Sequence, residues 1–135
     1  MKAAARPIRF IWHLPQESLA RLLRALLRRQ GRLRAETRSF GEARVYEHDG
    51  RWAVSLGRMI FVPYGSSYRL RAHEYGHTRQ SGILGWLYLP VVGLPSITIN
   101  LLSRRVTWFR RHYYDLFPER WANRLAHVEH LFAQR

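Results

Sequence analysis

The chain has no cysteine, which excludes disulfide bonds and thiolate metal ligands. Any metal ion in this protein must therefore be held by histidine, aspartate or glutamate. Lysine is almost missing, since Lys2 is the single lysine among 23 basic residues, and only nine residues are acidic. The formal net charge of +14 favours anionic partners such as nucleic acid, an anionic membrane or an acidic protein.

The N-terminal stretch MKAAARPIRFIW lacks the apolar run of about seven or more residues that a secretory signal needs. We expect a cytoplasmic protein, with membrane association left open. The 135 residues, of which 47% are apolar, suffice for a single domain with its own core. Residues 1–14 are a candidate flexible or docking arm.

An amphipathic helix is expected to begin near Pro15 and to end before Gly31. Its leucines would dock on the core, or the helix would lie on a membrane or nucleic acid through its basic face. The apolar stripe consists of Leu19, Leu22, Leu23, Leu26 and Leu27, and the basic face of Arg21, Arg24, Arg28 and Arg29.

Short strands are expected at residues 43–47 and 52–56, joined as a hairpin by a turn at Asp49-Gly50, with a third strand at 58–62. A helix from Tyr68 to Ser81, capped by a serine and stopped by Gly82, should follow. The pattern predicts an α+β fold with a small antiparallel or mixed sheet packed on this helix, and with further helices at both ends of the chain.

The predicted helix carries the motif HEYGH at residues 73–77. Residues four apart share a helix face, so His73 and His77 can hold one zinc ion. Glu74 lies about 100° around the helix, where it can act as general base on a zinc-activated water. The composition gives about 0.02 chance matches to this pattern. Gly76 inside the helix costs about 1 kcal/mol relative to alanine, which indicates a close approach by another backbone.

A third ligand must come from the few acidic residues after the motif, which are Asp115, Glu119 and Glu129. We assign Glu119, at the start of a last helix expected from about Pro118 to Phe132, with Trp121, Leu125, Val128 and Phe132 on its core face. Asn123 lies one turn further on and would orient His73. Asp115 is the fallback ligand or a helix cap, and His127 and His130 are surface or core residues. Tyr113 or Tyr114 would donate to an oxyanion, or pack in the core.

Residues 81–103 carry no charge over 23 positions. Pro90, Gly93 and Pro95 would break a membrane-spanning helix near its middle. A buried helix–turn–helix or a hairpin that touches a membrane is therefore favoured over a spanning helix, which the length still permits, and a dimer surface is a further reading. A basic aromatic patch follows, which would bind phosphate or headgroups or form a solvated helix flank. It consists of Arg104, Arg105, Trp108, Phe109, Arg110 and Arg111.

These residues resemble a family. His73-Glu-Tyr-Gly-His77 with the later Glu119-x-x-Ala-Asn123 is similar to the gluzincin branch of the zincin metallopeptidases, and in particular to minimal gluzincins and proteins of the ImmA/IrrE type. The chain also resembles small uncharacterised bacterial proteins that share SLG…IF, HEYGHT-x-Q, LYLP…G-PS and E-x-W-A-N, over residues 55–126. This resemblance implies a zincin-like fold whose edge strand, here residues 58–62, pairs with an extended peptide. The 41 residues between His77 and Glu119 exceed the compact gluzincin spacing.

We therefore expect a zinc-dependent metallopeptidase with one zinc ion per chain. The alternative is a non-catalytic basic module that contacts nucleic acid or an anionic membrane surface, with or without a metal. A salt-dependent affinity that is indifferent to Glu74 would identify the second function.

Overall fold

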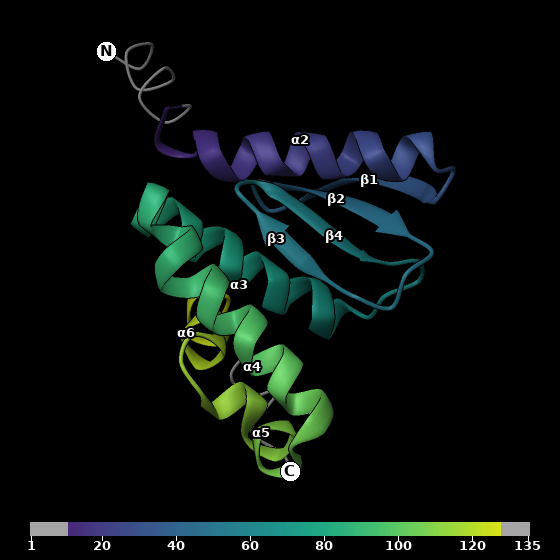
Figure 1. The fold of residues 1–135 in the computed structure, drawn as a ribbon. Helices are drawn as coiled ribbons and strands as arrows, with labels where there is room; N and C mark the ends of the chain where they lie inside the picture. Colours follow the sequence, from purple (N-terminus) through teal and green to yellow (C-terminus); the bar gives the residue numbers. More distant parts are fainter. Residues whose placement is uncertain (1–10, 128–135) are drawn as a thin grey trace.

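The computed structural model of the chain describes residues 11–127, with the side chains of residues 37–39 left out. Residues 1–10 of the expected arm lie outside this range, as do Val128, His130 and Phe132. The fold is α+β (Figure 1). In chain order the elements are α2 (Leu14–Arg29), β1 (Leu33–Phe40), β2 (Ala43–His48), β3 (Val54–Leu56), β4 (Met59–Pro63), α3 (Tyr68–Leu84), the 3-10 turn η1 (Gly85–Leu87), the π-helical turn η2 (Leu89–Gly93), α4 (Leu94–Arg105), α5 (Thr107–His112), the 3-10 turn η3 (Tyr113–Asp115) and α6 (Glu119–Leu125).

The four strands form a mixed sheet in the order β1-β2-β4-β3. The β2 and β4 strands are parallel, and the two outer pairs are antiparallel. The expected hairpin between residues 43–47 and 52–56 is therefore wrong, because β4 lies between these two strands. The Asp49-Gly50 stretch forms a local turn in which the Gly50 amide donates to His48 Nδ1 at 2.8 Å. The β3–β4 hairpin instead turns at Gly57, whose φ of +60° suits glycine.

Strand β1 was not expected from the sequence. Its residues alternate between small or apolar and charged side chains, as in Leu33, Arg34, Ala35 and Glu36. This alternation is typical of a half-exposed strand at the edge of a sheet, which is where β1 lies. The sequence therefore does contain the two-residue alternation of a strand, although the many charged residues make it hard to recognise.

Helix α2 covers one face of the sheet and ends before Gly31 as expected. Ala20 and Leu27 are buried against Tyr46 and Phe61. The expectation that the whole leucine stripe docks on the core is wrong for three of its members. The helix faces the sheet along the side that carries Ala20. Three leucines on the neighbouring side of the helix remain exposed: Leu19, Leu22 and Leu26.

Helix α3 packs on the opposite face of the sheet, where Leu70 and Tyr75 contact the cluster around Val45 and Ile60. The Ser67 side chain caps the helix by accepting from the Leu70 amide at 3.3 Å, which confirms the expected serine cap. The helix continues through Gly82 and ends at Gly85. Strands β2 and β4 are thus covered on both faces, which explains their nearly continuous burial.

The apolar segment from residue 81 to 103 is neither broken at its prolines nor folded as a buried helix–turn–helix, as the sequence had suggested. From Leu89 onward the chain continues as a helix through Pro90, Gly93 and Pro95. A π-helical turn accommodates the prolines, and in this turn the Leu94 amide donates to Leu89 O. Helix α4 has no buried residue, so the segment is not a buried helix–turn–helix. Within residues 11–127, no helix combines the length and apolar character that crossing a bilayer requires.

Candidate metal centre

Helices α3 and α6 meet at Gly76, where the backbone of one helix lies directly against that of the other. A Cβ atom built on Gly76 would stand 2.0 Å from Ala122 O and 2.5 Å from Ala122 C. Only glycine permits this approach. The expected close backbone contact at Gly76 is therefore confirmed, and it brings the motif helix into contact with the helix that begins at Glu119.

The three expected metal ligands come together at this contact. Glu119 Oε2 lies 2.8 Å from His73 Nε2 and 3.2 Å from His77 Nε2, and all three side chains are buried. Their ligand atoms lie within 4.8 Å of one another. Tetrahedral zinc ligands at about 2 Å from the ion are separated by about 3.3 Å. Two imidazole nitrogens and one carboxylate oxygen at these distances fit a zinc site that leaves one position open.

Gln80 determines which nitrogen of His77 faces the cluster. Its Nε2 donates to the carbonyl of Pro118 at 2.8 Å, and its Oε1 lies 2.7 Å from His77 Nδ1. A carbonyl can only accept, so the amide nitrogen of Gln80 must face Pro118 and its oxygen must face the ring. His77 therefore donates from Nδ1 and turns Nε2 toward Glu119, which is the orientation that a zinc ligand needs.

The other two ligands have similar supports. Asn123 Oδ1 lies 2.7 Å from His73 Nδ1, and Asn123 is buried one turn along α6 from Glu119, as expected. Ser96, on α4, donates a hydrogen bond to Glu119 Oε1. Each of the three ligands is thus held on its far side by a neutral polar group, so that the donor atoms point at one another.

His77 and Glu119 stabilise each other's charged forms. Burial alone would lower the pKa of His77, but the charge and hydrogen bond of Glu119, with a contribution from Glu74, raise it to about 9. Burial would raise the pKa of Glu119, but the two imidazoles hold it well below its usual range. A buried carboxylate is thereby kept ionised, as a metal ligand must be.

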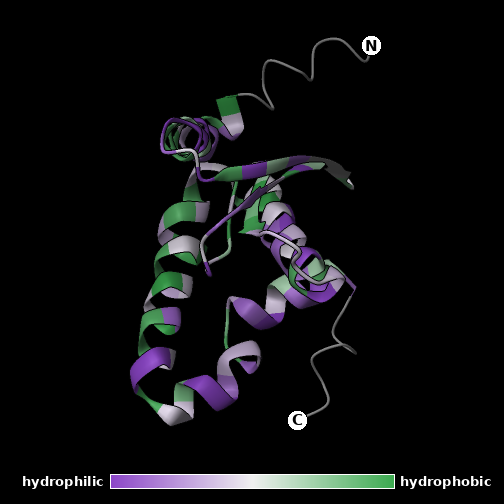
Figure 2. Cartoon of the chain, turned by 90° about the vertical axis from the view of Figure 1, so that its right-hand side faces the viewer, coloured by the Kyte–Doolittle hydropathy of each residue, from purple (hydrophilic) through white to green (hydrophobic). Residues whose placement is uncertain are grey.

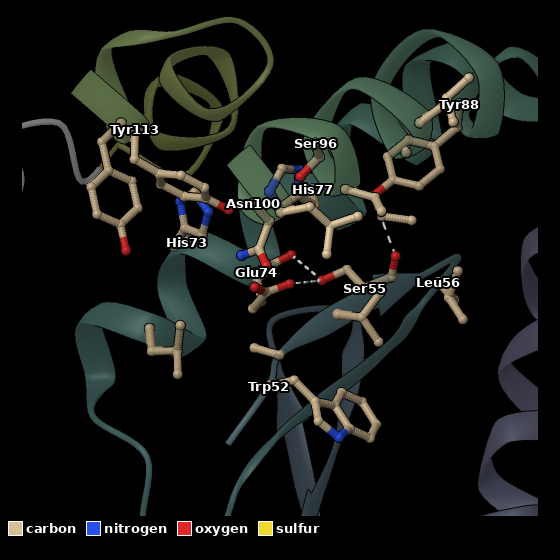
Figure 3. Close-up of a pocket in the computed structure, with 18 of the residues that line it drawn as sticks. Trp52, Ser55, Leu56, His73, Glu74, His77, Tyr88, Ser96, Asn100 and Tyr113 are labelled. Carbon is tan, nitrogen blue, oxygen red and sulfur yellow. Dashed lines mark hydrogen bonds between the residues drawn. The ribbon is translucent and has the colours of Figure 1, made fainter. Parts of the chain in front are cut away.

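Glu74 lies beside the cluster and is anchored by Ser55, on strand β3 (Figure 3). The Ser55 hydroxyl lies 2.7 Å from Glu74 Oε2 and 2.7 Å from the Glu74 carbonyl oxygen. Tyr88 donates in turn to the Ser55 carbonyl at 3.3 Å. Burial, with the charges of Glu74 and Glu119, keeps the pKa of Tyr88 well above its ordinary value, so its hydroxyl remains a donor.

His73, Glu74 and His77 line a cavity of about 670 Å³. One wall comes from residues 51–56 around β3 and another from η2 and α4. Tyr113 and Tyr114 also line the cavity. The Tyr114 ring packs edge-on against His73 at 5.1 Å, whereas Tyr113 is hydrogen-bonded to Asn100, and burial raises its pKa above the ordinary range. Both tyrosines therefore belong to the wall of the cavity.

Several expected residues lie elsewhere. Asp115 is exposed at the end of η3 and is neither part of the cluster nor a cap, since Pro118 occupies the N-cap position of α6. His127 is exposed just after α6, and Trp121 and Leu125 are half-buried. The expectation that residues 58–62 form the edge strand that pairs with a peptide is wrong, because β4 lies inside the sheet. Strand β3 is the edge strand beside the cavity.

The site includes four polar residues to which sequence reasoning assigned no role: Ser55, Gln80, Tyr88 and Ser96. Each occupies a lettered position in the patterns SLG, HEYGHT-x-Q, LYLP and G-PS that carry the resemblance. These letters were a usable indication of which residues lie at the site. The residue types alone did not indicate a role for these four side chains, because serine, glutamine and tyrosine are common on any protein surface.

Searches with family models, among curated proteins and among solved structures found no match to this chain.

Proposed function

We propose that this protein is a zinc-dependent peptidase of the gluzincin type. The observation that carries the proposal is the convergence of His73 Nε2 and His77 Nε2 on Glu119 Oε2, with each nitrogen within hydrogen-bonding distance of that oxygen. The donor set is the one that zinc prefers when no cysteine is present. Zinc bound there would polarise a substrate carbonyl and lower the pKa of a coordinated water to about 7.

The chain's own residues would supply the remaining chemistry. Glu74 is the one carboxylate of the HEYGH motif outside the ligand set, and Ser55 holds it at the cavity surface. It would accept a proton from the attacking water and deliver it to the departing amine nitrogen as the C–N bond breaks. Tyr113 or Tyr114 would donate to the oxygen of the tetrahedral intermediate. The products are a carboxylic acid and an amine.

Two substitutions test the metal and the general base separately. Glu119→Ala should lose the bound zinc, measured by elemental analysis of the purified protein. Glu74→Gln should keep about one zinc per chain but lose about 10²–10⁴-fold in the rate of peptide cleavage. The matched control is Glu42→Gln, which changes an exposed glutamate and should alter neither property. Undiminished cleavage by Glu74→Gln would refute the mechanism.

The non-catalytic basic module remains the competing proposal, supported by the net charge of +14. It requires nucleic-acid or lipid binding that weakens steeply with salt. If zinc fails to bind even when added, and if no peptide is cleaved, this module becomes the better account. The position of Glu74 favours the peptidase, because a metal-stabilised module would need the buried ligand cluster but no further carboxylate beside an open cavity.

A further inference from the structure

The segment from η1 to α4 leaves an unusual amount of apolar surface exposed beside the cavity. Leu87, Leu94 and Ile97 are 60%, 63% and 56% exposed, and Leu101 is 55% exposed. Leu94, Ile97 and Leu101 also line the cavity, so they form part of its rim. A folded protein rarely leaves large aliphatic side chains clustered in this way unless they contact another surface.

The charge around this segment has one sign. Between Tyr75 and Tyr114 the chain contains five arginines and no acidic residue. Arg104 and Arg105 occupy the last turn of α4, and Arg104 lines the same cavity as Leu101. The helix run on the left of Figure 2 is largely hydrophobic along η2 and α4 and becomes hydrophilic at its lower end, where α4 meets α5.

We propose that the exposed apolar face of η1, η2 and α4, with the arginines at the end of α4, docks on an anionic membrane surface. Leucine and isoleucine would enter the boundary between headgroups and acyl chains, while Arg104 and Arg105 would contact lipid phosphates. Trp108, which is 53% exposed in α5, is a side chain suited to the headgroup level. The protein would lie on the bilayer without crossing it.

The charge pattern favours this occupant over a second copy of the chain or a nucleic acid. Two copies joined through this face would double its positive charge, with no acidic residue in the segment to compensate. A nucleic-acid backbone would neutralise the arginines but would leave the aliphatic side chains without an apolar partner. An anionic bilayer satisfies both groups at once.

Docking through this face has a consequence for the cavity. Because Leu94, Ile97 and Leu101 belong to its rim, the mouth of the cavity would face the lipid surface. A substrate would then reach the site from the bilayer surface. The docking itself does not depend on the proposed peptidase activity, so Glu74→Gln should bind membranes as the native protein does. Such binding identifies the non-catalytic module only if the native protein also cleaves no peptide.

The experiment is vesicle flotation of the full chain. Vesicles of phosphatidylcholine alone are compared with vesicles containing equal amounts of phosphatidylcholine and phosphatidylglycerol. The native protein should float with the anionic vesicles and remain largely unbound with the neutral ones. Binding should weaken as salt is raised.

Two pairs of matched variants locate the surface. Leu94→Ser/Ile97→Ser should lower the apparent affinity at least about tenfold, whereas Leu22→Ser/Leu26→Ser, which removes exposed leucines from α2, should not.

Arg104→Gln/Arg105→Gln should lower the apparent affinity about 25-fold, at about fivefold per arginine near the surface. Its control is Arg28→Gln/Arg29→Gln, which changes the corresponding pair in the last turn of α2. Circular dichroism and zinc content identify any variant that fails to fold.

Three results would overturn the proposal. Equal binding to neutral and anionic vesicles would remove the role of the arginines. Equal loss in the α2 and α4 variants would show that total charge or apolar content matters and that this face does not. A stable dimer in solution that Leu94→Ser/Ile97→Ser converts to a monomer, with no vesicle binding by the native protein, would assign the face to a second copy.

Discussion

Replacing Gly76 with alanine tests the contact that assembles the site. The new Cβ would stand 2.0 Å from Ala122 O, whereas ordinary van der Waals contact begins at 3.4 Å. The atoms it would meet are backbone atoms, so no side-chain rotation relieves the overlap. Helix α6 must move away from α3 by about 1.4 Å, the difference between these two distances, and it carries Glu119 and Asn123 with it.

The matched control for this substitution lies on the same helix. Gly82 has nothing within 4 Å of the position of its Cβ, so Gly82→Ala adds only helix propensity. Both substitutions gain about 1 kcal/mol from that propensity, which cancels in the comparison. We expect Gly76→Ala to be less stable than Gly82→Ala by about 1–3 kcal/mol, which is the usual cost of overpacking.

Two measurements on these variants are needed. Urea denaturation in the presence of a chelator gives the free energy of unfolding without metal, and competition titration gives the zinc affinity. Gly76→Ala should be weaker in both, because the shift of α6 moves Glu119 Oε2 away from the two histidines. Equal stability and equal zinc affinity for the two variants would refute the argument that the helix contact positions the ligands.

Three further predictions concern Ser96, Ser55 and His77. Ser96→Ala should lower zinc affinity about 10–100-fold in a competition titration, because Glu119 loses a hydrogen bond; Ser103→Ala, on the same helix, should not. Ser55→Ala should retain zinc but lose roughly tenfold in the rate of peptide cleavage, since the proposed general base loses the hydroxyl that holds it; an unchanged rate would contradict this role. In chelated protein, the raised pKa of His77 should add about 3 kcal/mol of stability below pH 6.5 that is lost as the pH rises through about 9, measured by urea denaturation at several pH values.

The local features of the site could be predicted because they depend on neighbouring residues. The spacing of His73 and His77 placed both rings on one helix face. The serine cap of α3 and the glycine stop after α2 marked helix ends correctly, whereas the stop expected at Gly82 is wrong, because α3 continues to Leu84. The scarcity of acidic residues left few choices for a third ligand, and within residues 11–127 Glu119 is the one that the fold brings to the histidines. An interior glycine indicated a close backbone contact, which Ala122 provides.

The sheet could not be predicted as well because strand order depends on contacts between distant residues. An Asp-Gly turn suggested a hairpin, yet β2 pairs in parallel with β4 because helices α2 and α3 cover both faces of the sheet. A parallel pair of this kind has no local sequence pattern of its own. The same applies to the exposed face of α4, since its neutral composition suits a buried helix equally well.

The sequence by itself determined the donor types, the orientation of two histidines on one helix and the shortage of rival carboxylates, because composition and helix periodicity are local properties. Asn123 was expected to orient His73, and it does. Only the tertiary structure decided that Gln80 and Ser96 orient the other two candidate ligands and that Ser55 anchors Glu74. Three of these contacts join residues that are 19 to 50 positions apart. The fourth, between His77 and Gln80, spans three positions. Their geometry follows from the packing of α6 against α3 and of α4 over the site, which no single stretch of the chain encodes.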